Sequence, residues 1–158
     1  MEAANRGAAD AGGRTIGLNI CLPHEQRLNS YVTRELSFEF RYFFMRKLWF
    51  AHLARALVVF LGGFGTLDEL TEILTLAQTR KLQSPIPVIL YGKSYWNEII
   101  NFEALLRYGM IEREDLGLFQ YADDTATALA LLQGTLQAGP DEASPCFAHS
   151  RTRESSDR

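Results

Sequence analysis

The residues best suited to chemistry follow a short apolar run near the middle of the chain. Residues 56–61, with the sequence ALVVFL, predict a buried parallel strand, which Gly62, Gly63 and Gly65 then interrupt. After Thr66 the apolar positions recur every three or four residues, which predicts an amphipathic helix. A glycine turn between a strand and a helix N-terminus can bind phosphate, because free backbone N–H groups and the helix dipole both favour an anion there.

The same segment also has a purely structural interpretation. The sequence TLDE at residues 66–69 matches a capping box, in which Thr66 caps the helix and the side chain of Glu69 reaches back to it. The turn is neither a Walker A loop, which requires Gly-Lys-Ser/Thr, nor a G-x-G-x-x-G dinucleotide fingerprint. From spacing alone, phosphate binding and plain helix capping both remain open.

A second group of charged residues precedes the strand. Arg46 and Lys47 lie within residues 41–55, where the apolar spacing predicts a helix. Arginine can bind a phosphate or carboxylate through two hydrogen bonds and lysine through a point charge, although two solvated side chains on a helix face would also explain the pair. Glu72 and Thr75 follow Glu69 at steps of three, so we expect these three residues to lie roughly along one side of their helix.

The remaining segments alternate between strands and helices. We expect helices at residues 1–11, 94–107 and 124–133, the second of them capped by Ser94, and a short turn or helix at 112–116. We expect strands at residues 15–20, within 31–40, at 86–91 and, at a sheet edge, at 118–122. This alternation predicts an α/β fold with a mostly parallel sheet flanked by helices. Residues 1–136 then form one domain, and the polar residues 137–158 are predicted to be a disordered tail.

The composition argues against several classes of protein. A formal net charge of −3 gives no electrostatic case for binding DNA or RNA. No apolar run approaches the roughly 20 residues of a membrane-spanning helix, and the first residues lack the apolar core of a secretory signal. Cys21 and Cys146 make no disulfide framework, which indicates a reducing, cytoplasmic compartment. His24 and His52 lack partners at metal-ligand spacing, so we expect no metal site.

Two motifs, taken together, closely resemble those of a known family. MRK at residues 45–47 and LGGFGTLDE at residues 61–69 are similar to the paired R-K and P-G-G-x-G-T-x-x-E motifs of the LOG (Lonely Guy) family, long mislabelled as lysine decarboxylases. The similarity runs from residue 1 to residue 132 and includes residues 95–96. Members of that family are phosphoribohydrolases. They cleave the N-glycosidic bond of nucleoside 5′-monophosphates and release cytokinin or adenine together with ribose 5-phosphate.

The resemblance implies a Rossmann-like fold and assigns roles to individual residues. It makes Arg46 and Glu69 the catalytic pair. It also implies that the substrate is bound by a larger set, namely Glu25, Lys47, Gly62, Gly63, Phe64, Gly65, Thr66 and Thr75. It implies no cofactor. Such roles are chemically sensible, because a carboxylate can stabilise the oxocarbenium-like state of glycosidic cleavage and orient water, while arginine holds the phosphate or ribose.

The chain departs from the family pattern in two places. Leu61 stands where the family has proline, and residues 1–7 correspond to the early part of a family helix. We therefore expect the first two family strands, and the Gly-rich loop of the substrate pocket, to be missing. The expected function is hydrolysis of AMP or a cytokinin riboside monophosphate. The alternatives are a non-catalytic nucleotide-binding or carrier module and an inactive fragment.

The resemblance also implies a homodimer with active sites near its interface. The aromatic-rich residues 38–50 offer a surface for such an interface. Packing in the core of a single subunit explains the same residues, so both interpretations remain open at this point.

Overall fold

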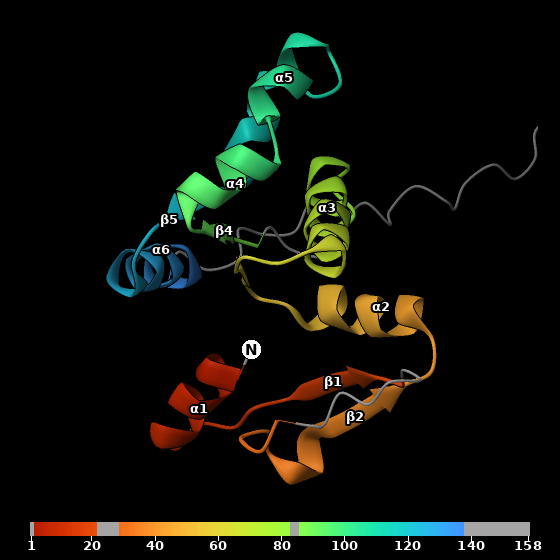
Figure 1. Ribbon diagram of the computed structural model, residues 1–158, viewed down its shortest axis with the longest axis vertical. Helices are drawn as coiled ribbons and strands as arrows, with labels where there is room; N and C mark the ends of the chain where they lie inside the picture. The colour runs from red at the N-terminus through yellow and green to blue at the C-terminus, as the bar shows by residue number, and fades with distance from the viewer. Residues whose placement is uncertain (1, 22–28, 83–85, 138–158) are drawn as a thin grey trace, which may run out of the picture. The chain divides into compact units, whose positions relative to one another are not determined.

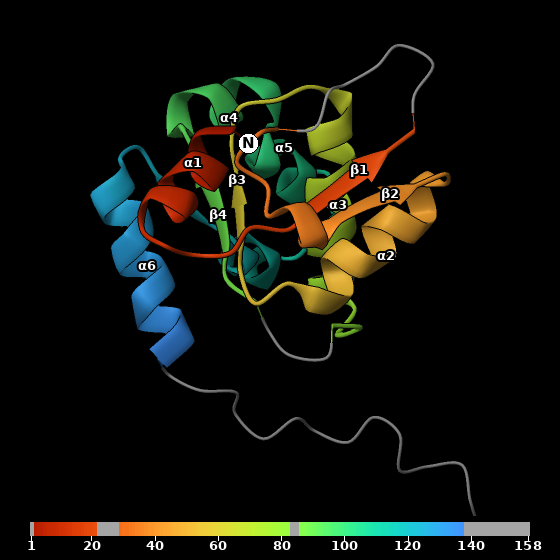
Figure 2. The ribbon, with the colours of Figure 1, turned by 90° about the horizontal axis from the view of Figure 1, so that it is seen from below.

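The computed structural model describes residues 2–21, 29–82 and 86–137. The chain forms two compact units, Met1–Ala54 and Arg55–Arg158, and each unit is described by itself (Figures 1 and 2). Short parallel sheets flanked by helices make the architecture α/β and Rossmann-like, as predicted. The tail predicted at residues 137–158 lies outside the described residues, except for Gln137 at the end of the last helix. It therefore stays a prediction, as does the single domain of residues 1–136.

The first unit contains a two-stranded parallel sheet and two helices. In chain order its elements are α1 (Glu2–Asp10), β1 (Gly17–Ile20), η1 (Arg34–Leu36), β2 (Ser37–Phe40) and α2 (Phe43–Leu53). Gly17 of β1 lies opposite Ser37 of β2, and Ile20 lies opposite Phe40. The two helices and two strands predicted for this region are confirmed. Two glycines end α1, because Gly12 has a φ of 73° and the Gly13 amide donates to the Ala8 carbonyl at 2.7 Å.

The second unit is built on a three-stranded parallel sheet. Its elements are β3 (Leu57–Val59), α3 (Phe64–Gln78), β4 (Val88–Tyr91), α4 (Lys93–Ile99), α5 (Phe102–Arg107), η2 (Arg113–Leu118), β5 (Gln120–Ala122) and α6 (Thr125–Gln137). The strand order is β3-β4-β5, so β5 is an edge strand, as predicted. Because β4 pairs on both sides, the parallel strands place the turns after β3 and β4 at the same edge of the sheet.

The core of the second unit surrounds β4. Val88, Ile89 and Leu90 are each at most 2% exposed, which fits the continuous apolar run of a strand covered on both faces. On one face, Ile89 forms a buried cluster with Ala122 of β5 and Ala128 of α6. Side chains alternate along a strand, so Val88 and Leu90 point to the opposite face. The turn that follows β4 is therefore anchored in the best-packed part of this unit.

One helix predicted for the second unit is in fact two. Residues 94–107 were expected to form a single helix capped by Ser94, but α4 ends at Ile99 and α5 begins at Phe102. The prediction is wrong because Asn101 caps α5 locally, its side chain accepting a hydrogen bond from the Ala104 amide at 2.8 Å. Ser94 does not cap α4 either, since that helix begins after Gly92, which has a left-handed conformation.

Among the residues that the structure describes, none of the helices combines the length and the apolar character needed to cross a bilayer.

Candidate functional site

The glycine turn connects β3 directly to the N-terminus of α3. The helix begins at Phe64 with Gly63 as its N-cap residue, and its first internal hydrogen bond runs from the Leu67 amide to the Gly63 carbonyl at 3.0 Å. The N–H groups of the first helical residues have no acceptor within their own helix. Residues 64–66 therefore present these N–H groups at the turn itself, at the positive end of the helix dipole.

The alternative of a capping box at this helix start is wrong. Thr66 was expected to be the N-cap, but α3 begins two residues earlier, so Thr66 lies inside the first turn. A Cβ built on Gly62 would overlap the Thr66 hydroxyl and would lie 2.7 Å from the Thr66 Cβ. The side chain of Thr66 therefore fills the space over Gly62. Glu69 is not at the third helical position, so its side chain is not placed to complete a capping box.

The three glycine positions of the turn differ in the space that is available for a side chain. Gly62 must lack a side chain because Thr66 occupies the space. In the described part of the chain, nothing comes within 4 Å of a Cβ built on Gly63 or on Gly65. Gly65 is also helical, where glycine is less favourable than alanine by up to about 1 kcal/mol. Packing within the protein does not account for these two glycines, whereas an anion approaching the bare backbone would.

The glycine turn after β3 is held in place by residues that follow the neighbouring strand, β4. The Tyr95 hydroxyl, on α4, donates a hydrogen bond of 2.6 Å to the Gly62 carbonyl oxygen. Leu61, which stands where the family motif has proline, lies against Gly92, because a Cβ built on Gly92 would be 2.9 Å from Leu61 Cδ1. Tyr95 had no predicted role. Residues 95–96 belong to the stretch that resembles the family, but no spacing rule connects them with the glycine turn.

The side chains of α3 face three directions. Leu70 and Ile73 are buried in the unit, whereas Glu69 and Glu72 are half-buried. Each step of three residues rotates a helical position by about 60°, so Thr75 is turned by about 120° from Glu69. Thr75 is exposed, and its hydroxyl donates to the Thr71 carbonyl at 2.7 Å. The expectation of a single side for Glu69, Glu72 and Thr75 is therefore too simple.

Thr75 lines a pocket of about 240 Å³ in the second unit. The walls come from α3, α5, η2 and the residues beside them, namely Thr71, Leu74, Thr75, Gln78, Ile100, Phe102, Leu105, Ile111, Asp115 and Leu118. Across it, the Gln78 amide nitrogen donates to Asp115 Oδ2 at 2.6 Å, and the same oxygen accepts from the Glu112 amide at 2.8 Å. The Gln78 and Asp115 side chains are thus bonded to each other, and most of the other residues that line the pocket are apolar. Glu69 and Glu72 do not line it.

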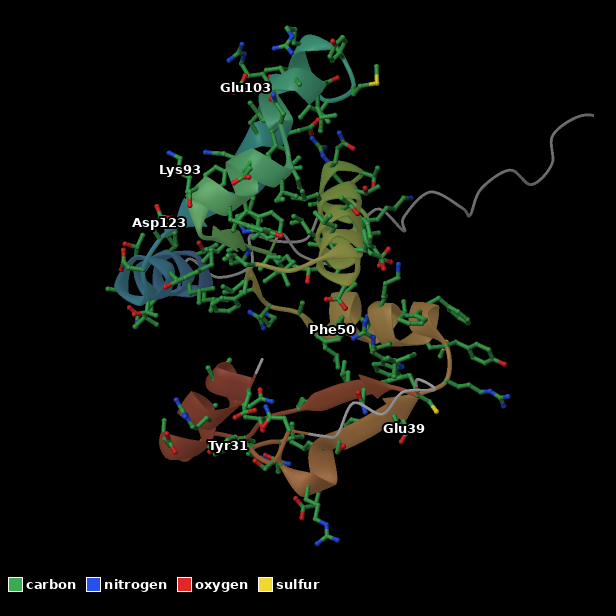
Figure 3. All side chains as sticks on the ribbon, viewed as in Figure 1. Tyr31, Glu39, Phe50, Lys93, Glu103 and Asp123 are labelled. Carbon is green, nitrogen blue, oxygen red and sulfur yellow. The ribbon has the colours of Figure 1, made fainter. Side chains whose placement is uncertain are left out.

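Arg46 and Lys47 lie on α2 in the first unit, and both side chains are half-buried. The Arg46 guanidinium carbon lies 5.9 Å from the centre of the Phe43 ring and 5.6 Å from that of Phe50, which is labelled in Figure 3. These distances are those of cation–π contacts, which orient the guanidinium. Since the two units are described separately, the pairing of Arg46 with Glu69 stays a prediction. Glu25 lies outside the described residues.

Within residues 2–21, 29–82 and 86–137, no three His, Cys, Asp or Glu side chains come close enough together to bind a metal ion.

Comparison with known protein families assigns the chain to one of them. The sequence profile of the family described as "Possible lysine decarboxylase" matches residues 1–132, which is most of the chain and contains both motifs. The chain belongs to the LOG family. "Possible lysine decarboxylase" is the former description of this LOG-family domain. A comparison with curated proteins gives no match. The resemblance of the two motifs to those of LOG proteins is thereby confirmed at the level of the family.

Proposed function

We propose that this LOG-family chain hydrolyses the N-glycosidic bond of a nucleoside 5′-monophosphate, either AMP or a cytokinin riboside monophosphate. Water adds its oxygen to C1′ of the ribose as the bond from C1′ to the base nitrogen breaks. The electron pair of that bond leaves with the base, which takes up a proton, so the products are the free base and ribose 5-phosphate. No cofactor enters this reaction.

One observation carries the proposal. In a LOG-family chain, Gly63 and Gly65 leave open space at the N-terminus of α3, although nothing in the described packing requires glycine at either position. Open backbone at a helix N-terminus suits a phosphate, since its N–H groups can donate hydrogen bonds to an anion and the dipole favours the charge. The 5′-phosphate would bind there, with contacts from residues 62–66.

The proposal gives the charged residues complementary tasks. Glu69 lies on α3 one turn beyond the phosphate-binding residues, and its half-buried carboxylate would stabilise positive charge on the ribose and orient the attacking water. Arg46 and Lys47 would supply positive charge to the phosphate or ribose. Glu25 and Thr75 would contact the substrate as well, which the family motifs alone suggest.

A substitution of Glu69 tests this mechanism. Glu69→Gln keeps the size of the side chain and removes its charge, so we expect release of adenine from AMP to fall by about 100-fold or more. Chromatography of the products measures the rate, and circular dichroism checks the fold. Glu103→Gln is the matched control, because Glu103 is an exposed glutamate on α5 (Figure 3).

Three results would count against the proposal in different ways. Unchanged turnover in Glu69→Gln would make Glu69 a structural residue. Absence of adenine from well-folded protein would reject hydrolysis of AMP, and the cytokinin riboside monophosphate would then be tested in the same way. Binding of AMP in a calorimeter without any product would instead support a nucleotide carrier.

We also propose that the chain acts as a homodimer. The helix α2 has no buried residue, and Phe43, Phe44, Leu48 and Leu53 are each more than half exposed. Exposed apolar side chains that gather on one element are typical of interaction surfaces in soluble proteins. A second copy of the chain is the partner that the family resemblance favours.

A further inference from the structure

The turn that follows β4 is fixed at both of its ends. Gly92 adopts a φ of 86°, and its amide donates to the Ala122 carbonyl of β5 at 2.8 Å. The next amide, of Lys93, donates to Asp123 Oδ1 at 2.7 Å, and Figure 3 shows these two labelled residues near each other. A short helix that begins in this way has little freedom to move relative to the sheet.

Tyr95 is mounted on this fixed base. The neighbouring Trp96 is fully buried, and its indole N–H donates to the Tyr91 carbonyl at 3.0 Å. The Tyr95 ring is half-buried and meets the Trp96 ring edge-on, with the ring centres 5.2 Å apart. Edge-to-face packing of this kind restricts the orientation of a tyrosine ring. The hydroxyl of Tyr95 is therefore held at a defined place.

The Tyr95 hydroxyl contacts the part of the glycine turn whose backbone has the greatest conformational freedom. Glycine has far more backbone freedom than other residues, so the peptide between Gly62 and Gly63 can rotate unless something holds it. The hydrogen bond of 2.6 Å from Tyr95 to the Gly62 oxygen holds one end of that peptide.

We infer that Tyr95 is a positioning residue for the nucleotide phosphate, and this inference rests on the proposed function. In a trans peptide the C=O and N–H groups point in opposite directions. Holding the Gly62 oxygen toward α4 therefore directs the Gly63 N–H away from α4. The backbone there is uncrowded, since a Cβ built on Gly63 or on Gly65 meets no described atom within 4 Å. Tyr95 touches neither substrate nor reacting atoms. It acts by keeping a phosphate-binding N–H group in its binding orientation.

The test is Tyr95→Phe, which removes the hydroxyl and keeps the ring and its contact with Trp96. Loss of a phosphate contact weakens substrate and transition state equally, so we expect KM for AMP to rise roughly three- to tenfold with kcat within a factor of two. Tyr108→Phe is the matched control, because Tyr108 follows α5 and is 73% exposed. It should leave both constants unchanged.

A second measurement does not depend on turnover. In nuclear magnetic resonance spectra, titration with ribose 5-phosphate should shift the Gly63 and Gly65 amide signals of the wild type. In Tyr95→Phe the same shifts should require a three- to tenfold higher concentration.

The outcomes separate the two proposals. If Tyr95→Phe binds ribose 5-phosphate as well as the wild type, the role of Tyr95 is overturned and the proposed function stands. If kcat falls while KM stays constant, Tyr95 does not act through phosphate binding, and the inference fails as well. If the wild type shows no shift at Gly63 or Gly65, phosphate does not bind at this turn, and both proposals are overturned together.

Discussion

Trp96 in the second unit has no exposed surface, whereas Trp49 in the first unit exposes 42% of its surface. The helices α2 and α3, which carry the candidate site residues, differ in the same way. α3 buries Leu70 and Ile73, but α2 buries none of its residues. Burial of apolar surface is the main source of folding stability, so the second unit has a core of its own to stabilise it. The first unit instead presents large apolar side chains at its surface, Phe43, Phe44 and Leu48 among them.

The same spacing of apolar residues therefore has a different structural meaning in α2 and in α3. Both helices were predicted from apolar residues spaced three or four positions apart, and both exist. In α3 the spacing marks a face packed in its unit, while in α2 the same spacing includes Phe44 and Leu48, which are 63% and 58% exposed. Periodicity therefore identifies an amphipathic helix without identifying what lies against its apolar face.

The largest expected effect comes from comparing the two tryptophans. Trp96→Ala removes a fully buried side chain and should lower the free energy of unfolding by about 3–5 kcal/mol. Trp49→Ala, at a partly exposed position, should cost about 1 kcal/mol or less at concentrations where the chain is monomeric. Urea titrations followed by circular dichroism measure both. Equal losses would show that the two units depend on buried surface to the same extent.

A substitution on α2 tests whether its exposed apolar side chains form the proposed dimer interface. Leu48→Glu places a charge on the exposed apolar face and should weaken the proposed dimer by about tenfold or more, because the carboxylate would be desolvated in an interface. Sedimentation velocity at several protein concentrations measures the dissociation constant. Leu129→Glu is the matched control, since Leu129 on α6 is exposed to a similar extent, 54% against 58%. If both variants dimerise like the wild type, α2 is not the interface.

The smallest expected effect on stability comes from two helical glycines. Gly65→Ala and Gly134→Ala should each raise the free energy of unfolding by up to about 1 kcal/mol, since neither added Cβ meets another atom of the described chain. Only Gly65→Ala should also weaken AMP binding, with KM rising roughly tenfold, because the added methyl group lies where the phosphate approaches. Thermal melts and steady-state kinetics measure the two effects. A stabilised Gly65→Ala variant with unchanged KM would remove the phosphate from this end of α3.

The sequence predicted most elements, because their signals are local. The run at residues 86–91 became β4, and the edge strand and last helix appeared where expected. The errors occurred where a local hydrogen bond or a glycine conformation outweighs periodicity. Asn101 divides a helix that apolar spacing made continuous, and Gly63 starts α3 before the threonine that resembled its cap. Hydrophobic spacing carries little information about such boundaries.

The sequence predicted those parts of the candidate site whose residues are close together along the chain. Residues 62–66 form one turn and Glu69 follows on the same helix, so their proximity comes from the chain itself. Tyr95 lies 33 positions after Gly62, and the two meet only because β3 and β4 are neighbours in the sheet. The separation of Thr75 from Glu69 depends on helix geometry that a step of three residues approximates poorly.

The contact between Gly62 and Thr66 restricts which sequence changes this family member can accept. Because the β-carbon of the threonine itself crowds position 62, and not only its rotatable hydroxyl, no choice of rotamer makes room for a methyl group there. A variant that gains a side chain at position 62 has to lose the one at position 66. Mutant libraries that randomise the two positions independently should therefore contain mostly misfolded members, with survivors in which at least one of the two is glycine.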